Sequence, residues 1–247
     1  MLNRIKKKSI NDQLIYDKYL ESTYSRSNNL EKSEYENACK EYERLYAKFF
    51  SNDKKKEILD IGCGAGHFLY YLKKRGFENF LGIDISAQQI EFCKSVVTKK
   101  VKQVDVFEFL DGVENKYNLI LASDLLEHIK RKKIIKFLGL VYQSLKKDGI
   151  LFLRVPNMSN PFSIDSRYRD FTHLSGFTDR SLFQILYSAG FRDIQINSSE
   201  VRVKSINSFF RKLIVLLFHK IIKFFYYIQE YSVPNNLGKN LFVTCKK

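Results

Sequence analysis

The sequence lacks several features that are typical of secreted, zinc-binding or membrane-spanning proteins. Its four cysteines form no close pair, so we expect neither a disulfide framework nor a zinc site of the usual spacing. The first residues are basic and contain no apolar core, so we expect no secretory signal there. The longest unbroken apolar run, Leu213 to Phe218, is far shorter than the roughly 20 residues that a spanning helix needs. These absences favour a protein of the reducing cytoplasm.

Acidic residues are also scarce. The 247 residues include 27 Asp and Glu against 42 Lys and Arg, which gives a net charge of +15. Such a surplus indicates either an anionic partner (nucleic acid, an acidic membrane face or a phosphorylated substrate) or a lysine-rich solvated surface. The hydrophobic fraction of 45% is enough for one sizeable core, alone or with an appendage.

Short apolar runs and amphipathic segments alternate along most of the chain. Runs rich in Ile, Leu and Val predict strands at 57–61, 79–85, 101–106, 117–122, 149–155, 192–197 and 240–245. Helical periodicity predicts helices at 31–50, 66–75, 87–97, 125–147 and 178–190. This alternation is typical of a parallel sheet that is covered on both faces. We therefore expect an N-terminal helical cap (1–56), an α/β domain (57–200 with 238–247) and a helical insertion (201–237).

A loop rich in glycine follows the first predicted strand in "EILDIGCGAGHFLYYL". Its glycines allow positive φ angles and let a ligand approach the main chain. Their spacing is tighter than G-x-G-x-x-G, and no Lys-Ser/Thr pair follows to make a phosphate loop. Asp84 ends the second strand, where a doubly wound sheet holds a ribose diol. Asp105 ends the third, where its carboxylate can meet an adenine amino group, with Val106 and Phe107 packing on the ring.

These motifs in this order resemble the class I S-adenosylmethionine-dependent methyltransferases. "LDIGCGAG" is similar to their first motif, "GIDIS" to their acidic second motif, and "LKKDGILFLRVPN" to the segment that enters their fifth strand. The resemblance implies a Rossmann-like seven-stranded sheet with the last strand antiparallel, and S-adenosyl-L-methionine as the cofactor. The residues that it places around the cofactor are Asp60, Gly62, Cys63, Gly64, Gly66, Asp84, Ile85, Asp105, Val106 and Ser123.

Two acids and two histidines form the second candidate group. "SDLLEH" would place Asp124, Glu127 and His128 on one helix face, and His173 in "RYRDFTHLSGF" can return to the same edge of the sheet. The pattern resembles the ubiquinone-pathway O-methyltransferases and the small-RNA 3′-end 2′-O-methyltransferases. This implies that these four residues bind a divalent cation, Mg²⁺ or Mn²⁺. The alternatives are a metal-free site with His173 or His128 as the catalytic base, and a purely structural role.

The segment "RDFTHLSGFTDRSLFQILYSAGF" resembles methyltransferases that accompany bacterial capsule and O-antigen synthesis. This implies O-methylation of a sugar or a phosphorylated precursor of a cell-surface polysaccharide. The residues expected to bind the substrate are Arg154, Asn157, Arg167 and Arg169. The alternative acceptors are a polyprenyl-phenol, a phosphate or phosphoramidate group of a capsule, and an RNA 2′-hydroxyl. A membrane-bound scaffold that binds the cofactor without catalysis is a further alternative.

The insertion before the last strand is basic and aromatic. Residues 202–223 include six basic residues and no acid, and a helix there would be apolar around most of its surface. Residues 206–229 would therefore contact the inner face of the cytoplasmic membrane, or form a lid or a homodimer contact. We do not expect nucleic acid as a partner, because the chain contains no recognisable RNA-binding module.

Overall fold

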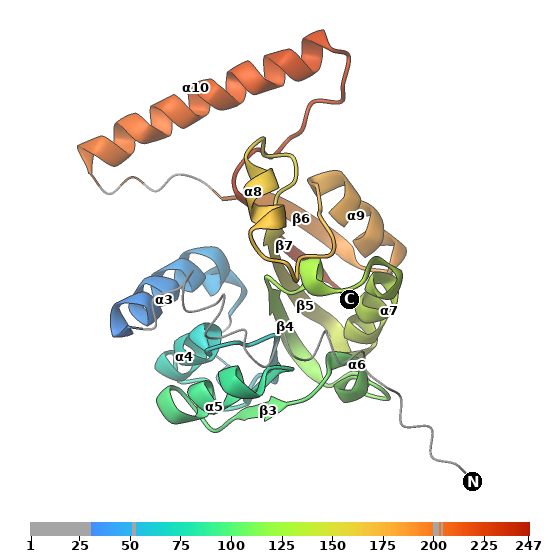
Figure 1. The fold of residues 1–247 in the computed structure, drawn as a ribbon. Coiled ribbons are helices and arrows are strands. Elements are labelled where there is room, and N and C mark those ends of the chain that lie inside the picture. Colours follow the sequence, from blue (N-terminus) through green and yellow to red (C-terminus); the bar gives the residue numbers. More distant parts are fainter. Residues whose placement is uncertain (1–30, 51–52, 200–202, 204) are drawn as a thin grey trace. The chain divides into compact units, whose positions relative to one another are not determined.

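The computed structural model describes residues 31–50, 53–199, 203 and 205–247 (Figure 1). The predicted N-terminal cap therefore lies partly outside the described residues. The chain divides into two compact units. The first comprises the described residues up to Ser123, with Lys136–Leu151 and Lys247, and the second comprises Asp124–Ile135 and Phe152–Lys246. The predicted boundaries at residues 56, 200 and 238 stay a prediction.

The strands form one seven-stranded sheet in the order β3-β2-β1-β4-β5-β7-β6. The strand bounds are β1 Ile58–Ile61, β2 Phe80–Asp84, β3 Val101–Gln103, β4 Tyr117–Ser123, β5 Leu145–Pro156, β6 Arg192–Ser198 and β7 Asn240–Lys246. In the first unit β1 pairs in parallel with both β2 and β4, and β2 pairs in parallel with β3. In the second unit β6 and β7 are antiparallel. This arrangement confirms the expected sheet with its antiparallel last strand.

Helices of the first unit hold the glycine-rich loop. They are α3 Lys32–Tyr46, α4 His67–Lys74, α5 Ala87–Val96 and α6 Val106–Phe109, with a short 3₁₀ turn at Ala47–Phe49. Aromatic side chains of α3 pack on α4, and the ring centroids of Tyr42 and Phe68 are 5.1 Å apart. The buried Tyr35 hydroxyl donates a hydrogen bond to the Ala65 carbonyl, 2.9 Å away. Thus α3 contacts the loop directly, as well as the helix that follows it.

The second unit contains the segments that hold the other predicted site. Its helices are the 3₁₀ helix Leu126–His128, the start of α7 Arg131–Ser144, α8 Ser163–Tyr168, α9 Asp179–Ser188 and α10 Ile206–Ile228. Thr178 caps α9, because its hydroxyl accepts a hydrogen bond from the Ser181 amide. None of the described helices combines the length and the apolarity needed to cross a bilayer.

Two predicted elements differ from the structure for local reasons. The predicted strand 101–106 ends at Gln103, because Asp105 instead caps α6 by accepting a hydrogen bond from the Phe107 amide. The predicted helix 125–147 begins only at Arg131. Before it the chain forms only the 3₁₀ helix Leu126–His128, and Ile129 is extended with φ of −86° and ψ of 129°, which an α-helix does not allow.

We predict that Gly82→Ala destabilises the first unit. A Cβ there would lie 2.6 Å from Leu69 Cδ1 and 2.8 Å from Cys63 Sγ, and both side chains are buried. We expect the free energy of unfolding to fall by about 1–3 kcal/mol in urea titrations, as for other overpacked sites. Gly139→Ala in α7 is the control, since a Cβ there would meet open space, and it should be neutral or stabilising. Equal effects of the two substitutions would contradict this packing argument.

Candidate functional site

The Asp84 carboxylate organises the glycine-rich loop. It is 9% exposed and accepts hydrogen bonds from the Gly64 amide at 2.9 Å and the Ser86 amide at 2.8 Å. The amides of Gly62 and Cys63 both donate to the carbonyl of the residue before it in β2, at 2.8 and 3.0 Å. The loop after β1 is therefore tied to the end of β2 through side chain and main chain, and its shape depends on Asp84.

The loop needs glycine for conformational and steric reasons. Gly62, Gly64 and Gly66 have φ angles of 71°, 52° and 85°, a region that other residues adopt at a cost. A Cβ on Gly66 would also collide with Cys93 Sγ of α5. The loop is therefore bare of side chains at all three positions, which lets a ligand approach the main chain.

Asp60 is the most perturbed acid of the first unit. It is 3% exposed at the end of β1, and burial together with the nearby Asp84 raises the pKa of its carboxyl from 3.8 to about 8. Burial also raises the pKa of Asp84. Two buried carboxyl groups at the ends of adjacent strands favour a ligand that brings positive charge or hydrogen-bond donors.

The first unit contains every residue that the sequence predicts at the cofactor. Ile85 and Ser123 are partly exposed where β2 and β4 end, and Asp105 and Val106 lie at the start of α6. Phe107 is turned into the unit rather than left open, since its ring packs edge-on against Phe137 at 6.4 Å. Whether these residues contact the cofactor stays a prediction.

The second unit brings Glu127, His128 and His173 together. One potential ligand atom from each residue lies within 4.8 Å of the others. The two imidazole rings have centroids 4.7 Å apart and are tilted by 69°. The backbone of Glu127 is anchored to the segment after His173, because its carbonyl accepts hydrogen bonds from the amides of Leu174 and Ser175. We call Glu127, His128 and His173 the acid–histidine cluster.

Hydrogen bonds define the tautomer of each imidazole in the cluster. His173 Nδ1 lies 2.7 Å from the Ser166 carbonyl; a carbonyl only accepts, so Nδ1 carries the proton. The Thr172 hydroxyl donates to Asp170 Oδ1 at 2.6 Å and lies 2.8 Å from His128 Nδ1. That hydroxyl can therefore only accept from His128. In the neutral form, either ring would therefore have its lone pair on Nε2, the tautomer that a metal ligand or a catalytic base needs.

The residues of the cluster are buried or half-buried and little charged, and a bound cation would stabilise the ionised form of its carboxyl. Among the described residues, no hydrogen-bond donor reaches either carboxylate oxygen of Glu127, which is 2% exposed. Burial raises the pKa of the Glu127 carboxyl well above its usual range, and repulsion from Asp124 adds to the shift. Burial and the neighbouring His173 lower the pKa of His128 to about 4, so this imidazole is neutral at pH 7. A buried carboxyl that no described donor reaches and two imidazoles whose neutral forms keep a lone pair on Nε2 are a fitting donor set for a divalent metal.

Asp124, the predicted fourth ligand, lies outside the cluster in this structure. Its backbone is left-handed, and its side chain forms an ion pair with Arg154. The backbones are joined as well, since the Asp124 amide donates to the Arg154 carbonyl at 2.9 Å. The helix face that the spacing predicted for Asp124, Glu127 and His128 is absent, which corrects that part of the prediction. A role for Asp124 as a ligand stays a prediction and would require it to leave Arg154.

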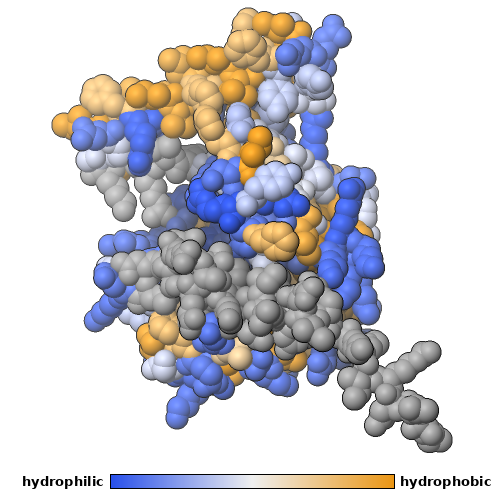
Figure 2. Space-filling view, in the orientation of Figure 1, coloured by the Kyte–Doolittle hydropathy of each residue, from blue (hydrophilic) through white to orange (hydrophobic). Residues whose placement is uncertain are grey.

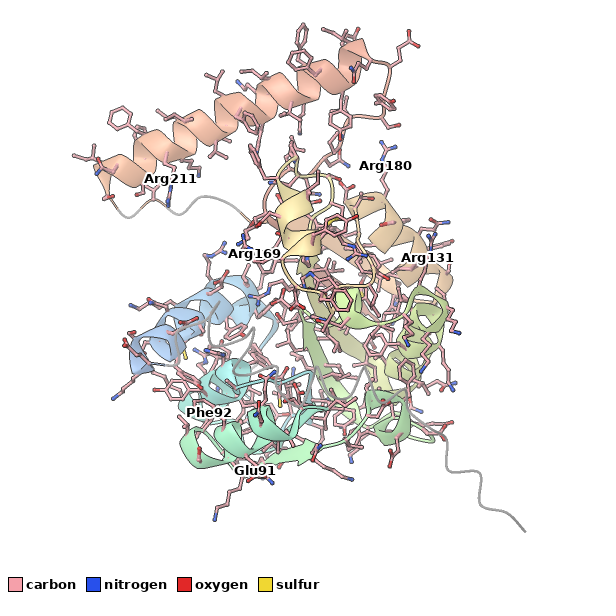
Figure 3. All side chains as sticks on the ribbon, in the orientation of Figure 1. Glu91, Phe92, Arg131, Arg169, Arg180 and Arg211 are labelled. Carbon is pink, nitrogen blue, oxygen red and sulfur yellow. The ribbon has the colours of Figure 1, made fainter. Side chains whose placement is uncertain are left out.

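The arginines predicted to bind the substrate have protein partners. Arg167 donates to the carbonyls of His173 and Leu174 and thereby supports the cluster. Arg169 pairs with Asp165 on the surface of α8, where Figure 3 labels it. The ion pair between Arg169 and Asp165 is more exposed to solvent than the ion pair between Arg154 and Asp124.

Asn157 is fully buried in the second unit. Its amide group donates to the carbonyls of Asn236 and Gly238 at 3.0 and 2.8 Å, so it fixes the loop that precedes β7. The role in substrate binding that the sequence suggested for Asn157 stays a prediction.

The sequence did not identify the residues that orient the histidines. Asp170 and the carbonyl of Ser166 define the two tautomers through contacts that are visible only in three dimensions. Asp170 is 9% exposed. Its position three residues before His173 was the one feature of the sequence that could have indicated this orienting role. A buried acid beside a "Thr-His" pair is what an imidazole needs to be oriented.

Comparison with known proteins identifies the family. The chain matches the model of a family described as a methyltransferase domain over residues 31–196, more than half of its length. The chain belongs to this methyltransferase family. Together with the fold, the match makes it a class I S-adenosylmethionine-dependent methyltransferase domain, and the resemblance that the glycine loop and Asp84 indicated is confirmed.

Similar proteins act on different acceptors. A ubiquinone biosynthesis O-methyltransferase from Rhodopseudomonas palustris (strain HaA2) is 32% identical over 124 residues, 49% of this chain and 47% of that protein. A ribosomal protein L11 methyltransferase from Thermosipho africanus (strain TCF52B) is 30% identical over 117 residues, 44% of this chain and 42% of that protein. The methyltransferase thus spans less than half the length of these curated relatives.

A solved structure shares the fold over most of the chain. It is described as a SAM-dependent methyltransferase from Archaeoglobus fulgidus, with a TM-score of 0.66 and 24% identity. The alignment covers 86% of this methyltransferase and 94% of that chain. At this identity the likeness shows the fold, and the acceptor has to be argued from the residues of the site.

The raised pKa of Asp60 predicts how stability depends on pH. Above about pH 4 the unfolded chain releases this proton, while the folded protein keeps it up to about pH 8. The unfolded state therefore binds fewer protons, so the free energy of unfolding should fall between pH 4 and 8. We expect Asp60→Asn to make this slope shallower by up to about 1.4 kcal/mol per pH unit, measured by urea unfolding without cofactor. An unchanged slope would contradict the assignment.

Proposed function

We propose that this protein is an S-adenosylmethionine-dependent O-methyltransferase with a metal-assisted acceptor site. In this proposal the first unit binds the cofactor, and Glu127, His128 and His173 of the second unit hold Mg²⁺ or Mn²⁺. The observation that supports it best is the acid–histidine cluster, in which one ligand atom of each residue lies within 4.8 Å of the others, both Nδ1 atoms face hydrogen-bond acceptors and a buried carboxyl has no donor among the described residues. When bound, the cation would lower the pKa of an acceptor hydroxyl and fix its position.

The chain's own residues would do the remaining work. The sulfonium group of the cofactor is already activated, so the protein has to align an oxygen with the methyl carbon and see that its proton is removed. In the metal-free alternative, His128 would take that proton, because its lowered pKa keeps it unprotonated at pH 7. Asp60 and Asp84 would complement the positive charge and the ribose hydroxyls of the cofactor, and the glycine loop, which lacks side chains at residues 62, 64 and 66, would let the cofactor approach the main chain.

The acceptor that we propose is a sugar or a phosphorylated precursor of a bacterial cell-surface polysaccharide, of the capsule or O-antigen kind. Arg169 is the arginine best placed to bind a phosphate group. Its pair with Asp165 is solvent-exposed, and such pairs exchange at little cost. Arg154 and Arg167 would act indirectly, through Asp124 and the carbonyl of His173. Methylation of a capsule phosphate or phosphoramidate is the alternative that uses the same arginines.

Other acceptors stay as alternatives. A polyprenyl-phenol is supported by the similarity to a ubiquinone biosynthesis O-methyltransferase. RNA 2′-O-methylation is supported only by the net charge and by the pattern of the cluster. A non-catalytic scaffold would leave the ordered tautomers of two histidines without a purpose. We propose that the protein acts in the cytoplasm, and that residues 206–229 bring it to the inner face of the membrane or form a homodimer.

Metal dependence can be tested without knowing the acceptor in advance. Nucleotide sugars, glycan phosphates and short RNAs are screened with a labelled methyl donor. We expect incorporation to be lost in a chelator and regained with Mg²⁺ or Mn²⁺. His173→Ala should abolish turnover but keep cofactor affinity, whereas His219→Ala in α10 should behave like the wild type. Full activity in the chelator would contradict the metal and favour His128 or His173 as a metal-free base.

The orientation of His128 gives a separate prediction. Thr172→Val removes the hydroxyl that accepts from Nδ1, so we expect Mn²⁺ affinity to fall about 10–100-fold, as for other residues that orient metal ligands. Thr172→Ser keeps the hydroxyl and should bind Mn²⁺ like the wild type. Binding is followed by electron paramagnetic resonance, and cofactor affinity, which should not change, checks folding. A Thr172→Val protein with normal Mn²⁺ affinity would refute this role.

A further inference from the structure

Helix α10 presents its apolar side to solvent. None of its residues is buried, and the outward-facing apolar residues are between 45% and 76% exposed. On a helical wheel most of these residues fall on one arc, and Phe209, Leu216 and Tyr227 extend it on the far side of Lys220. The arc itself comprises Ile206, Phe210, Leu213, Ile214, Leu217, Ile221, Phe224, Phe225 and Ile228. Figure 2 shows the resulting hydrophobic surface along α10. A helix on the surface of a globular protein normally shows the reverse pattern, with its apolar arc toward the core.

The opposite arc of α10 faces its own unit and is partly polar. Its half-buried residues are Ser208, Lys212, Val215, Phe218, His219, Ile222, Lys223 and Tyr226. Two contacts fix this orientation: the Phe218 ring stacks on Phe162 at 5.5 Å, and Lys223 Nζ donates to the Asn235 carbonyl at 3.2 Å. Among the residues that the structure describes, the contacts of α10 leave its apolar arc uncovered, and an exposed apolar surface of this kind marks an interaction site.

The charge of α10 indicates which kind of surface would cover its apolar arc. The sequence between Glu200 and Glu230 contains no acidic residue, while Arg211 borders the apolar arc on one side and Lys220 lies on the other side, between the arc and Phe209. Figure 3 shows Arg211 projecting from the first half of α10. A second copy of this helix would bring cations against cations with no carboxylate to pair them. An anionic lipid surface complements both the flanking cations and the apolar arc.

We propose that α10 lies in the plane of an anionic bilayer surface, with the Leu217 and Phe224 side buried among the acyl chains. Its 23 residues make a contact about 34 Å long at 1.5 Å per residue. The inference rests on the membrane contact in the proposed function and deepens it, because it chooses lipid over a homodimer. It does not depend on the metal or on the acceptor. The membrane inference can therefore fail while the proposed methyltransferase activity holds, and the activity can fail while the membrane inference holds.

The test is flotation of the full-length protein with vesicles of phosphatidylcholine, with and without phosphatidylglycerol. We expect the wild type to bind the anionic vesicles and to be released by salt. Leu217→Glu/Phe224→Glu should weaken binding about tenfold or more, because it places charge in the apolar arc. Phe183→Glu, on a ring of α9 that is half exposed, is the control and should bind normally.

A second pair of variants tests the charge. Arg211→Gln/Lys220→Gln should lower binding to anionic vesicles several-fold and reduce its dependence on salt, whereas Lys132→Gln/Lys136→Gln on α7 should do neither. Cofactor affinity of every variant, and of a deletion of 206–229, checks that the first unit is folded. A wild type that does not bind anionic vesicles would overturn the proposal. So would a dimer that Leu217→Glu/Phe224→Glu dissociates in the absence of any lipid binding.

Discussion

The burial of carboxyl groups where strands end is the constraint on which both candidate sites depend. In the first unit Asp84 fixes the glycine loop through two amides, and Asp60 lies beside it with a pKa raised to about 8. In the second unit Glu127 is buried with no hydrogen-bond donor to its carboxylate among the described residues. Buried acids cost free energy unless a partner compensates them. Each unit therefore keeps a local instability that a ligand of the right charge would relieve, as functional sites often do.

Much of the fold was predictable because its signals are local. Alternating apolar runs and amphipathic segments define the seven strands. The positions 62, 64 and 66 are glycine because their φ angles are positive, which other residues adopt at a cost. The errors arose where a side chain competes with regular structure. Asp105 caps α6 and thereby shortens β3, and Asp124 takes a left-handed conformation where a helix was expected. Such choices depend on neighbours that periodicity does not reveal.

The candidate site was predictable in composition and less so in arrangement. The sequence indicated Glu127, His128 and His173 by their likeness to a known pattern, and the structure brings them together. It could not indicate that Asp124 pairs with Arg154, or that an acid acts on His128 through the Thr172 hydroxyl. Those relations cross between segments that are distant in sequence. They decide which nitrogen carries the proton, and so they decide what the imidazoles can do.

The way β6 and β7 meet has a consequence for how this molecule can change. The strands pair from Arg192 with Lys246 to Ser198 with Leu241, and the Ser199 amide donates to the Asn240 carbonyl just beyond. The segment that contains α10 therefore connects two chain positions that are already hydrogen-bonded to each other. The entropy of closing a loop grows only with the logarithm of its length. Evolution can therefore lengthen, trim or replace this segment while the sheet keeps its pairing, and a lineage can acquire a new binding surface without giving up its chemistry.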